Sequence, residues 1–80
     1  MRLFYSPKFK KELKSFPKEI RLKFYKQAEF LLKNLKHPSL RAKKYGGSSE
    51  IWQARVDHTL RFYFIIQKDT YILLHIQRHK

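Results

Sequence analysis

The 80-residue chain contains no cysteine, only two glycines and just six acidic residues. The absence of cysteine excludes a disulfide framework and a thiolate metal site, and it suits a reducing cytoplasm. No apolar run is long enough to span a membrane. The first seven residues also lack the apolar stretch of a secretory signal. We therefore expect a cytoplasmic protein without a membrane segment.

Positive charge dominates what is present. The sequence has 19 lysines and arginines, which gives a formal net charge of +13. A field of this sign favours RNA, DNA, an acidic protein or anionic lipid as a partner. The hydrophobic fraction of 42% and the aromatic fraction of 16% suffice for a packed core and argue against disorder. We expect one small domain over residues 1–80 that binds a polyanion.

The first half of the chain carries helix signals. Residues 1–5 resemble a short strand, after which Ser6 is a good N-cap and Pro7 a good first helical residue. Pro17 interrupts the apolar periodicity and can begin a second helix. That helix should end near His37, because the residue before a proline avoids helical geometry. The pattern predicts two helices that form a hairpin.

The second half carries strand signals. Residues 37–49 lose all periodicity and indicate an exposed loop. Three strands should follow, near residues 50–56, 60–67 and 70–77. The order is strand, helix, helix and a three-stranded meander. It predicts an α+β fold (β-α-α-β-β-β), in which the N-terminal strand and the helical hairpin pack on one face of an antiparallel sheet.

The alternation of apolar and polar residues sets the register of the first hairpin. To share one core face, Ala54 must lie opposite Phe62. Arg55 then lies directly across from Arg61. Like charges at this position destabilise a sheet by about 0.2–1 kcal/mol, and an anionic partner would relieve the repulsion.

The last strand extends this polar face. Pairing Ile66 with Ile72 and Phe64 with Leu74 would continue the core face through Ile76. The opposite face then gathers six polar residues: Gln53, Arg55, Arg61, Tyr63, His75 and Gln77. Guanidinium forks suit phosphate, and tyrosine and imidazole rings can stack on bases.

Ordinary structural interpretations stay open for this face. Asp57 could pair with Arg55, and Tyr63 and His75 could be half-buried sheet residues. A small apolar set on the same face could form a second core under a loop or a docking patch for a partner. Its members are Ile51, Ile65 and Leu73.

The sequence from residue 51 onward contains the run Ile-Trp-Gln-Ala-Arg-Val, then Leu-Arg-Phe-Tyr-Phe, and finally Tyr-Ile-Leu-Leu-His-Ile-Gln-Arg-His-Lys. With the basic charge and the element order, these runs resemble the RelE/ParE toxin superfamily of bacterial and archaeal toxin–antitoxin systems. The resemblance covers essentially the whole chain and is strongest over residues 51–80. It implies a toxin that an acidic antitoxin neutralises by wrapping around it.

The resemblance also implies a reaction. RelE-like and YoeB-like members cut mRNA in the ribosomal A site, where the RNA 2′-hydroxyl attacks the adjacent phosphate. No metal or other cofactor is expected. The implied partners are the antitoxin, mRNA and the ribosome, together with operator DNA through the antitoxin complex. ParE-like members poison DNA gyrase instead, and a third alternative is a non-catalytic basic module that binds antitoxin and operator DNA.

The family motifs assign roles to several residues. Arg61 matches the arginine on the scissile phosphate, and Arg55 matches a basic residue on the preceding strand. His79 matches the general acid of YoeB-like members, and Arg78 could instead replace the C-terminal arginine of RelE-like members. The remaining RNA contacts are expected from Arg41, Lys43, Lys44, Gln53, Tyr63, His75, Gln77 and Lys80.

Two positions depart from the family pattern. The loop before the meander lacks the glutamate base of YoeB-like members, and Glu50 at the start of the following strand is the nearest acid. The terminal tyrosine of those members is replaced by Lys80. The general base is therefore not assigned from the sequence.

Overall fold

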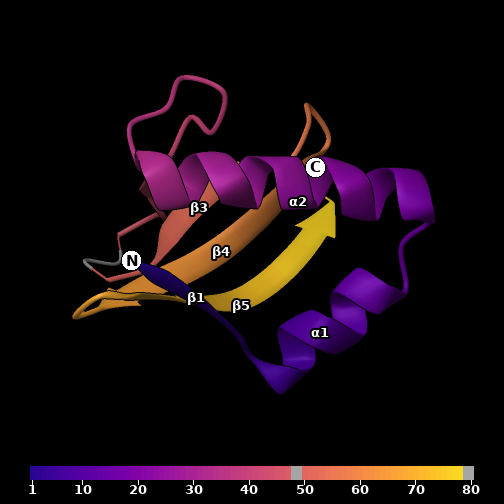
Figure 1. Cartoon of the computed structure of the whole chain (residues 1–80), viewed down its shortest axis with the longest axis horizontal. Coiled ribbons are helices and arrows are strands. Elements are labelled where there is room, and N and C mark those ends of the chain that lie inside the picture. The colour runs from indigo at the N-terminus through magenta and orange to yellow at the C-terminus, as the bar shows by residue number, and fades with distance from the viewer. Residues whose placement is uncertain (48–49, 79–80) are drawn as a thin grey trace.

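The computed structural model describes residues 1–47 and 50–78. Within these ranges two helices pack on a five-stranded sheet in the strand order β1-β5-β4-β3-β2 (Figure 1). The elements are β1 Arg2–Tyr5, α1 Pro7–Lys14, α2 Lys18–Lys33, β2 Lys43–Lys44, β3 Trp52–Arg55, β4 Leu60–Gln67 and β5 Thr70–Arg78. The predicted α+β fold is confirmed. Neither described helix is long and apolar enough to cross a membrane.

Two details of the sheet differ from the prediction. β1 pairs with β5 in parallel, with Leu3 opposite Tyr71, so the sheet is mixed and not wholly antiparallel. Two helices and three strands of the described chain lie between β1 and β5 in the sequence. This connection is long enough for β5 to run parallel to β1. The short strand β2 also forms inside the predicted loop and pairs with β3.

The helix boundaries follow local capping. The Ser6 Oγ accepts a hydrogen bond of 3.1 Å from the Phe9 N–H, and Pro7 is the first helical residue, as expected. α2 ends at Lys33, earlier than the expected stop near His37. Asn34 is extended there, with its side chain accepting a hydrogen bond from the Lys36 N–H. This local turn competes with continuation of the helix.

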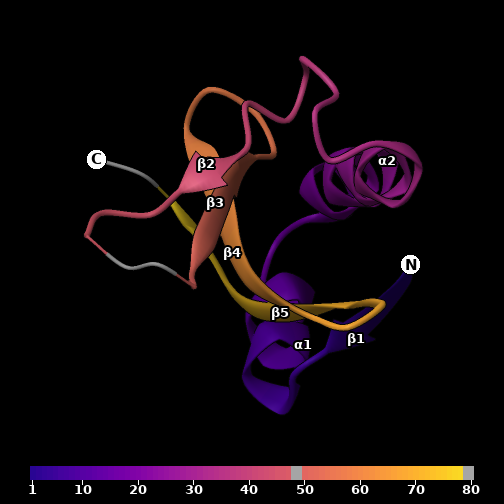
Figure 2. The ribbon, with the colours of Figure 1, turned by 90° about the vertical axis from the view of Figure 1, so that its left-hand side faces the viewer.

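Aromatic rings fill the space between the helices and the inner sheet face. Phe24 of α2 lies 5.2 Å from Phe9 of α1 and 5.3 Å from Phe62 of β4, measured between ring centroids. All three side chains are fully buried. Figure 2 shows α2 on one side of the curved sheet, so the other side of β3 and β4 is free to carry polar groups.

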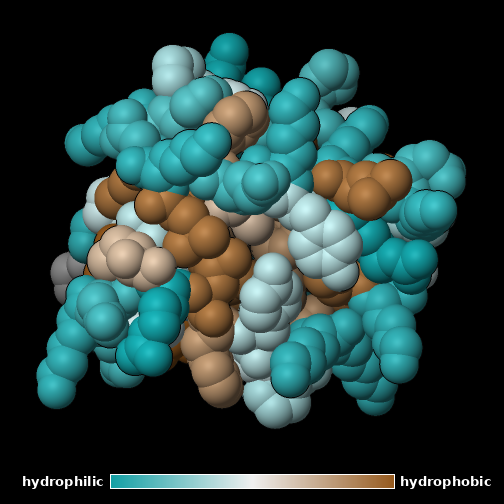
Figure 3. All heavy atoms as spheres, viewed as in Figure 1, coloured by the Kyte–Doolittle hydropathy of each residue, from teal (hydrophilic) through white to brown (hydrophobic). Residues whose placement is uncertain are grey.

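The helix side of the molecule is mostly charged but not uniformly so. Figure 3 shows hydrophilic residues over this side with apolar areas among them. The side chains of Leu22 and Leu32 on α2 are 55% and 40% exposed. The core therefore does not use every apolar residue of α2.

The predicted register of the β3–β4 hairpin is confirmed, with Ala54 opposite Phe62 and Arg55 opposite Arg61. On the β4–β5 side, Tyr63 lies opposite His75 and Arg61 opposite Gln77, also as predicted. The alternation of apolar and polar residues therefore predicted the register in the half of the sheet nearest to the β3–β4 turn.

Beyond Tyr63 the predicted register of β5 is wrong. Phe64 pairs with Leu73 rather than Leu74, because the ladder shifts between Tyr63 and Phe64. Such a bulge inserts one extra residue and changes which side chains face the core. Ile66 accordingly pairs with Tyr71 and not with Ile72. Tyr71 and Leu73 are buried in place of Ile72 and Leu74, so Leu73 does not belong to an outer apolar set.

Candidate functional site

Two rows of side chains cross the outer face of the sheet, opposite the helices. Directly paired residues point to the same face, so the pairings Lys43–Gln53, Gln53–Tyr63 and Tyr63–His75 define one row. The pairings Arg55–Arg61 and Arg61–Gln77 define the next row. We call this surface the basic face; it consists of Arg41, Lys43, Tyr45, Gln53, Arg55, Arg61, Tyr63, His75 and Gln77.

Arg61 is held in place by the turn that precedes it. Its Nη1 donates hydrogen bonds of 2.7 Å to the Asp57 carbonyl oxygen and 3.3 Å to the Leu60 carbonyl oxygen. No ion pair joins Arg61 or Arg55 to a carboxylate in the described part of the chain. The guanidinium of Arg61 is therefore oriented but keeps its positive charge uncompensated.

The Asp57 carboxylate is engaged elsewhere and forms no ion pair with Arg55, although its charge offsets part of the repulsion that Arg55 experiences. It accepts hydrogen bonds from the N–H groups of Thr59 (2.8 Å) and Leu60 (2.9 Å), and it lies 3.6 Å from the Lys23 Nζ. Burial works in the opposite direction, but these hydrogen bonds and the Lys23 charge lower the pKa of Asp57 below its ordinary value. Asp57 thus builds the turn that presents Arg61.

Arg55 is fixed through its backbone. Its N–H donates to the Leu40 carbonyl oxygen at 2.7 Å, and its carbonyl oxygen accepts from the Gln27 Nε2 at 2.7 Å. The Nε of Arg55 is buried without a hydrogen-bond partner. Desolvation, followed by the charges of Arg41 and Arg61, lowers the pKa of the Arg55 guanidinium. An anion on this face would offset the repulsion between the three guanidinium groups.

Arg41 joins this cluster from the segment before β2. Its backbone adopts a φ of 46°, the left-handed region that side-chain-bearing residues rarely occupy. A strained non-glycine residue of this kind costs about 1 kcal/mol or more. The surrounding contacts therefore hold a strained arginine beside two other arginines.

Gln27 is a site residue that the sequence analysis did not identify. It lies on α2 and is only 5% exposed. Its Nε2 also donates to the Ser39 carbonyl oxygen at 3.1 Å, and its Oε1 accepts from the Ser39 Oγ at 2.9 Å. The sequence does contain a sign of this role, because Gln27 is a polar residue within the apolar stripe of the helix, three positions after Phe24 and four before Leu31. A polar side chain at such a position is buried and needs hydrogen-bond partners.

A shallow pocket of about 230 Å³ opens on the basic face and is lined by Tyr45, Ile51, Tyr63, His75 and Gln77. The Tyr63 side chain is only 5% exposed, and the ring of Tyr45 lies over it at a centroid distance of 5.0 Å. Tyr45 is 46% exposed. The ring that a base can reach is therefore Tyr45, which the sequence analysis placed in a loop without a role.

His75 has a partner from α1. The Glu12 Oε1 lies 3.9 Å from the His75 Nδ1 and accepts a hydrogen bond of 3.1 Å from the Ile76 N–H. β1 covers β5 only as far as Leu73, so the edge of β5 beyond that residue is left to α1. Figures 1 and 2 show α1 beside β5. The helix thus supplies a carboxylate to the edge of the basic face.

The structure separates other expected site residues. Lys43 pairs with Gln53 on the basic face, but the Lys44 Nζ lies 4.8 Å from the centroid of the Trp52 ring, on the other side of the sheet. Arg78 pairs with Leu60, and its guanidinium lies 5.8 Å from the Phe16 ring, also away from the basic face. His79 and Lys80 lie outside the described residues.

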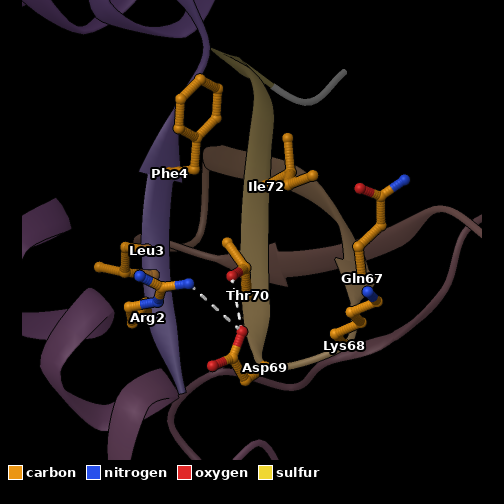
Figure 4. A pocket seen from close by; sticks show the side chains of 8 residues that line it. All are labelled: Arg2, Leu3, Phe4, Gln67, Lys68, Asp69, Thr70 and Ile72. Atoms are coloured by element: carbon orange, nitrogen blue, oxygen red, sulfur yellow. Dashed lines mark hydrogen bonds and ion pairs between the residues drawn. The ribbon is translucent and has the colours of Figure 1, made fainter.

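A larger pocket of about 880 Å³ lies at the opposite end of the sheet (Figure 4). It is lined by β1 and by the β4–β5 turn, where the Arg2 Nη2 lies 3.6 Å from the Asp69 Oδ1. Apolar side chains, including Phe4 and Ile72, make up much of its wall. None of the residues of the basic face contributes to it. In the part of the chain that the structure describes, no group of three histidine or acidic side chains is arranged to hold a metal ion.

No protein-family model matches this sequence, and no characterised protein sequence matches it either. Solved structures do match its fold. The YoeB dimer from Staphylococcus aureus superposes with a TM-score of 0.84 at 14% identity, over 100% of this chain and 98% of that chain. The YoeB/ParE toxin from Agrobacterium tumefaciens gives 0.83 at 10% identity, over 100% of both chains.

An archaeal RelE–RelB complex from Pyrococcus horikoshii is also similar, with a TM-score of 0.78 at 17% identity, over 96% of this chain and 92% of that chain. The protein therefore shares the fold of YoeB, RelE and ParE-like toxins. At these identities the likeness concerns the fold alone, and the function of this chain depends on the residues of its basic face.

Proposed function

We propose that this chain is the toxin of a type II toxin–antitoxin system and that it cleaves mRNA on the ribosome. The main support is the Arg55–Arg61 pair. The two arginines lie directly opposite each other on neighbouring strands, on the sheet face away from the helices, and neither forms an ion pair with a described acidic residue. The shared fold of YoeB and RelE toxins supports the assignment. The net charge of +13 suits a target made largely of RNA.

Each arginine has a defined task in this reaction. Arg61, oriented by the Asp57 carbonyl oxygen, binds the scissile phosphate and stabilises the charge that develops on it. Arg55 supports the same phosphate from the neighbouring strand, where it lies directly opposite Arg61. Arg41 and Lys43 bind the RNA backbone on either side. His79 remains the proposed general acid from the resemblance, and Arg78, whose guanidinium lies beside the Phe16 ring, is the alternative.

An acidic antitoxin is the proposed partner in the resting state. The RelE of P. horikoshii was solved as a complex with RelB, and the basic surface of the present chain calls for a partner of opposite charge. Covering the basic face would relieve the repulsion between Arg41, Arg55 and Arg61. We place the complex in the cytoplasm, where its ribosomal target is found.

The test is to express the chain in cells without its antitoxin and map mRNA 5′ ends across the transcriptome. We expect new ends within translated reading frames for the wild type and their loss for Arg61→Ala. Lys33→Ala, which removes an exposed lysine from α2, serves as the charge-matched control and should cleave like the wild type. Equal cleavage by wild type and Arg61→Ala would refute the site.

One observation favours a second candidate, inhibition of DNA gyrase. No carboxylate is among the described residues that line the pocket beside Tyr63. The similar A. tumefaciens structure is that of a YoeB/ParE toxin. Inhibition of gyrase supercoiling by the purified chain, without RNA cleavage, would establish this alternative.

A further inference from the structure

The pocket on the basic face contains one group suited to accept a proton. Its described lining residues include the hydroxyl groups of Tyr45 and Tyr63 and the imidazole of His75. A neutral imidazole has a ring nitrogen with a free lone pair, and histidine is the commonest general base in enzymes. His75 is therefore the lining group whose chemistry matches a general base.

The pairings of the sheet bring His75 next to the phosphate-binding arginine. Tyr63 lies opposite His75, and Arg61 lies opposite Gln77. His75 and Arg61 are thus diagonal neighbours on one face, a relationship that places their Cβ atoms about 7 Å apart in antiparallel sheets. A phosphate held by Arg61 would therefore lie next to the row of side chains that carries the imidazole.

Glu12 gives the imidazole an orientation and a counter-charge. Its Oε1 lies 3.9 Å from the Nδ1, which leaves the Nε2 as the ring nitrogen that faces away from α1. The same oxygen is fixed by the hydrogen bond from the Ile76 N–H. The groups around the ring are Glu12 from α1, Tyr63 from β4 and Tyr45 beside Tyr63. A fixed carboxylate here stabilises the imidazolium that proton uptake creates.

We propose that His75 is the general base of the reaction and that Glu12 is its positioning residue. This inference rests on the proposed mRNA cleavage. The Nε2 of His75 takes the proton of the 2′-hydroxyl while the 2′-oxygen forms a bond to phosphorus and the bond from phosphorus to the 5′-oxygen breaks. The leaving 5′-oxygen takes its proton from the general acid, the role proposed above for His79, and the imidazolium of His75 returns its proton to solvent. The products are a 2′,3′-cyclic phosphate and a 5′-hydroxyl.

The experiment measures single-turnover mRNA cleavage on programmed ribosomes. General-base catalysis contributes about 10²–10⁴-fold, so His75→Ala should lose at least about 100-fold in rate. Added imidazole should restore part of that rate in His75→Ala and leave the wild type unchanged. Binding of an mRNA with a 2′-deoxy nucleotide at the cleavage position should fall far less in His75→Ala than the cleavage rate does.

Glu12→Gln isolates the role of the carboxylate. Glutamine keeps an oxygen that can accept the Ile76 N–H, so the fold is preserved, but it removes the counter-charge. We expect about a tenfold slower cleavage at unchanged mRNA affinity, because a lost counter-charge weakens but does not abolish proton uptake. Glu19→Gln, an exposed acid in the first turn of α2, is the matched control and should cleave like the wild type.

The outcomes separate this inference from the function on which it depends. If His75→Ala cleaves mRNA as fast as the wild type does, the assignment of His75 is overturned and the proposed function is not. A slow His75→Ala that imidazole does not rescue also overturns it, because a structural role would give that result. Full activity of Glu12→Gln overturns the role of Glu12. If the wild type does not cleave mRNA on ribosomes, the proposed function and this inference both fail.

Discussion

The Gln27 Nε2 on α2 donates a hydrogen bond of 2.7 Å to the carbonyl oxygen of Arg55, which lies 28 residues further along the chain. With the bond from the Arg55 N–H to the Leu40 carbonyl oxygen, it fixes the strand end that carries an arginine of the basic face. The two hydrogen bonds to Ser39 tie the neighbouring segment to the same side chain. One buried amide thus connects the helix layer to the proposed phosphate site.

Gln27→Leu should therefore weaken both the fold and the site. The substitution leaves the half-buried Arg55 carbonyl oxygen without this donor, and an unsatisfied buried group costs about 1–3 kcal/mol. We expect the free energy of unfolding, measured with urea, to fall by about 1–3 kcal/mol. Lys26→Leu, at the exposed neighbouring position, should change it by less than about 0.5 kcal/mol. A similar effect of the two substitutions would contradict this role of Gln27.

Tyr45 should provide the stacking surface of the basic face. Stacking of a base on an aromatic side chain is worth about 1–3 kcal/mol, so Tyr45→Ala should weaken binding of single-stranded RNA by roughly 5–150-fold. Tyr25→Ala is a close control, because both tyrosines are 46% exposed and Tyr25 lies on α2. Fluorescence anisotropy with a short labelled RNA would measure both. Equal losses would show that Tyr45 has no special place in RNA binding.

The backbone conformation of Arg41 should lower the stability of the protein, while its charge should strengthen RNA binding. Glycine occupies positive φ freely, whereas a side chain there costs about 1 kcal/mol, so Arg41→Gly should be about 1 kcal/mol more stable to urea than Arg41→Ala. Both variants lose the same charge near Arg55 and should weaken RNA binding equally. Arg41→Ala as stable as Arg41→Gly would contradict the strain.

Asp57 should make stability depend on pH at the acidic end. Its pKa is lower in the folded protein than its ordinary value, so its contribution is complete above about pH 4 and is lost as the pH falls through the folded pKa. Urea unfolding at a series of pH values should show this loss in the wild type and a smaller loss in Asp57→Asn. The carboxylate also accepts from Thr59 and Leu60, so the variant should be less stable at neutral pH. Identical pH profiles for the two proteins would be evidence against this network.

Much of the fold followed from short-range patterns in the sequence. Ser6 and Pro7 start α1 by capping chemistry that acts within one helical turn, and the phase of apolar residues placed Arg55 opposite Arg61. The β5 register failed beyond Tyr63 because a bulge depends on packing against both neighbouring strands. The parallel pairing of β1 with β5 likewise depends on the path of the whole chain.

The sequence predicted the candidate site less completely than the fold. Arg55, Arg61, Tyr63 and His75 share a face because strand periodicity requires it. Gln27 and Glu12 reach the same region from helices, and a contact between elements distant in sequence leaves no periodic signal. The separation of Lys43 from Lys44 required the short strand β2, which is two residues long and carries no pattern of its own.

The most direct test of a phosphate site at Arg55 and Arg61 is the salt dependence of RNA affinity. Each phosphate contact with single-stranded RNA contributes about 0.7 to the slope of log affinity against log salt concentration. The double variant Arg55→Ala/Arg61→Ala should therefore make this dependence on salt less steep by about 1.4. The exposed control Lys8→Ala/Lys33→Ala removes the same charge and should leave the steepness nearly unchanged. Equal slopes for the two double variants would contradict a phosphate site at this pair.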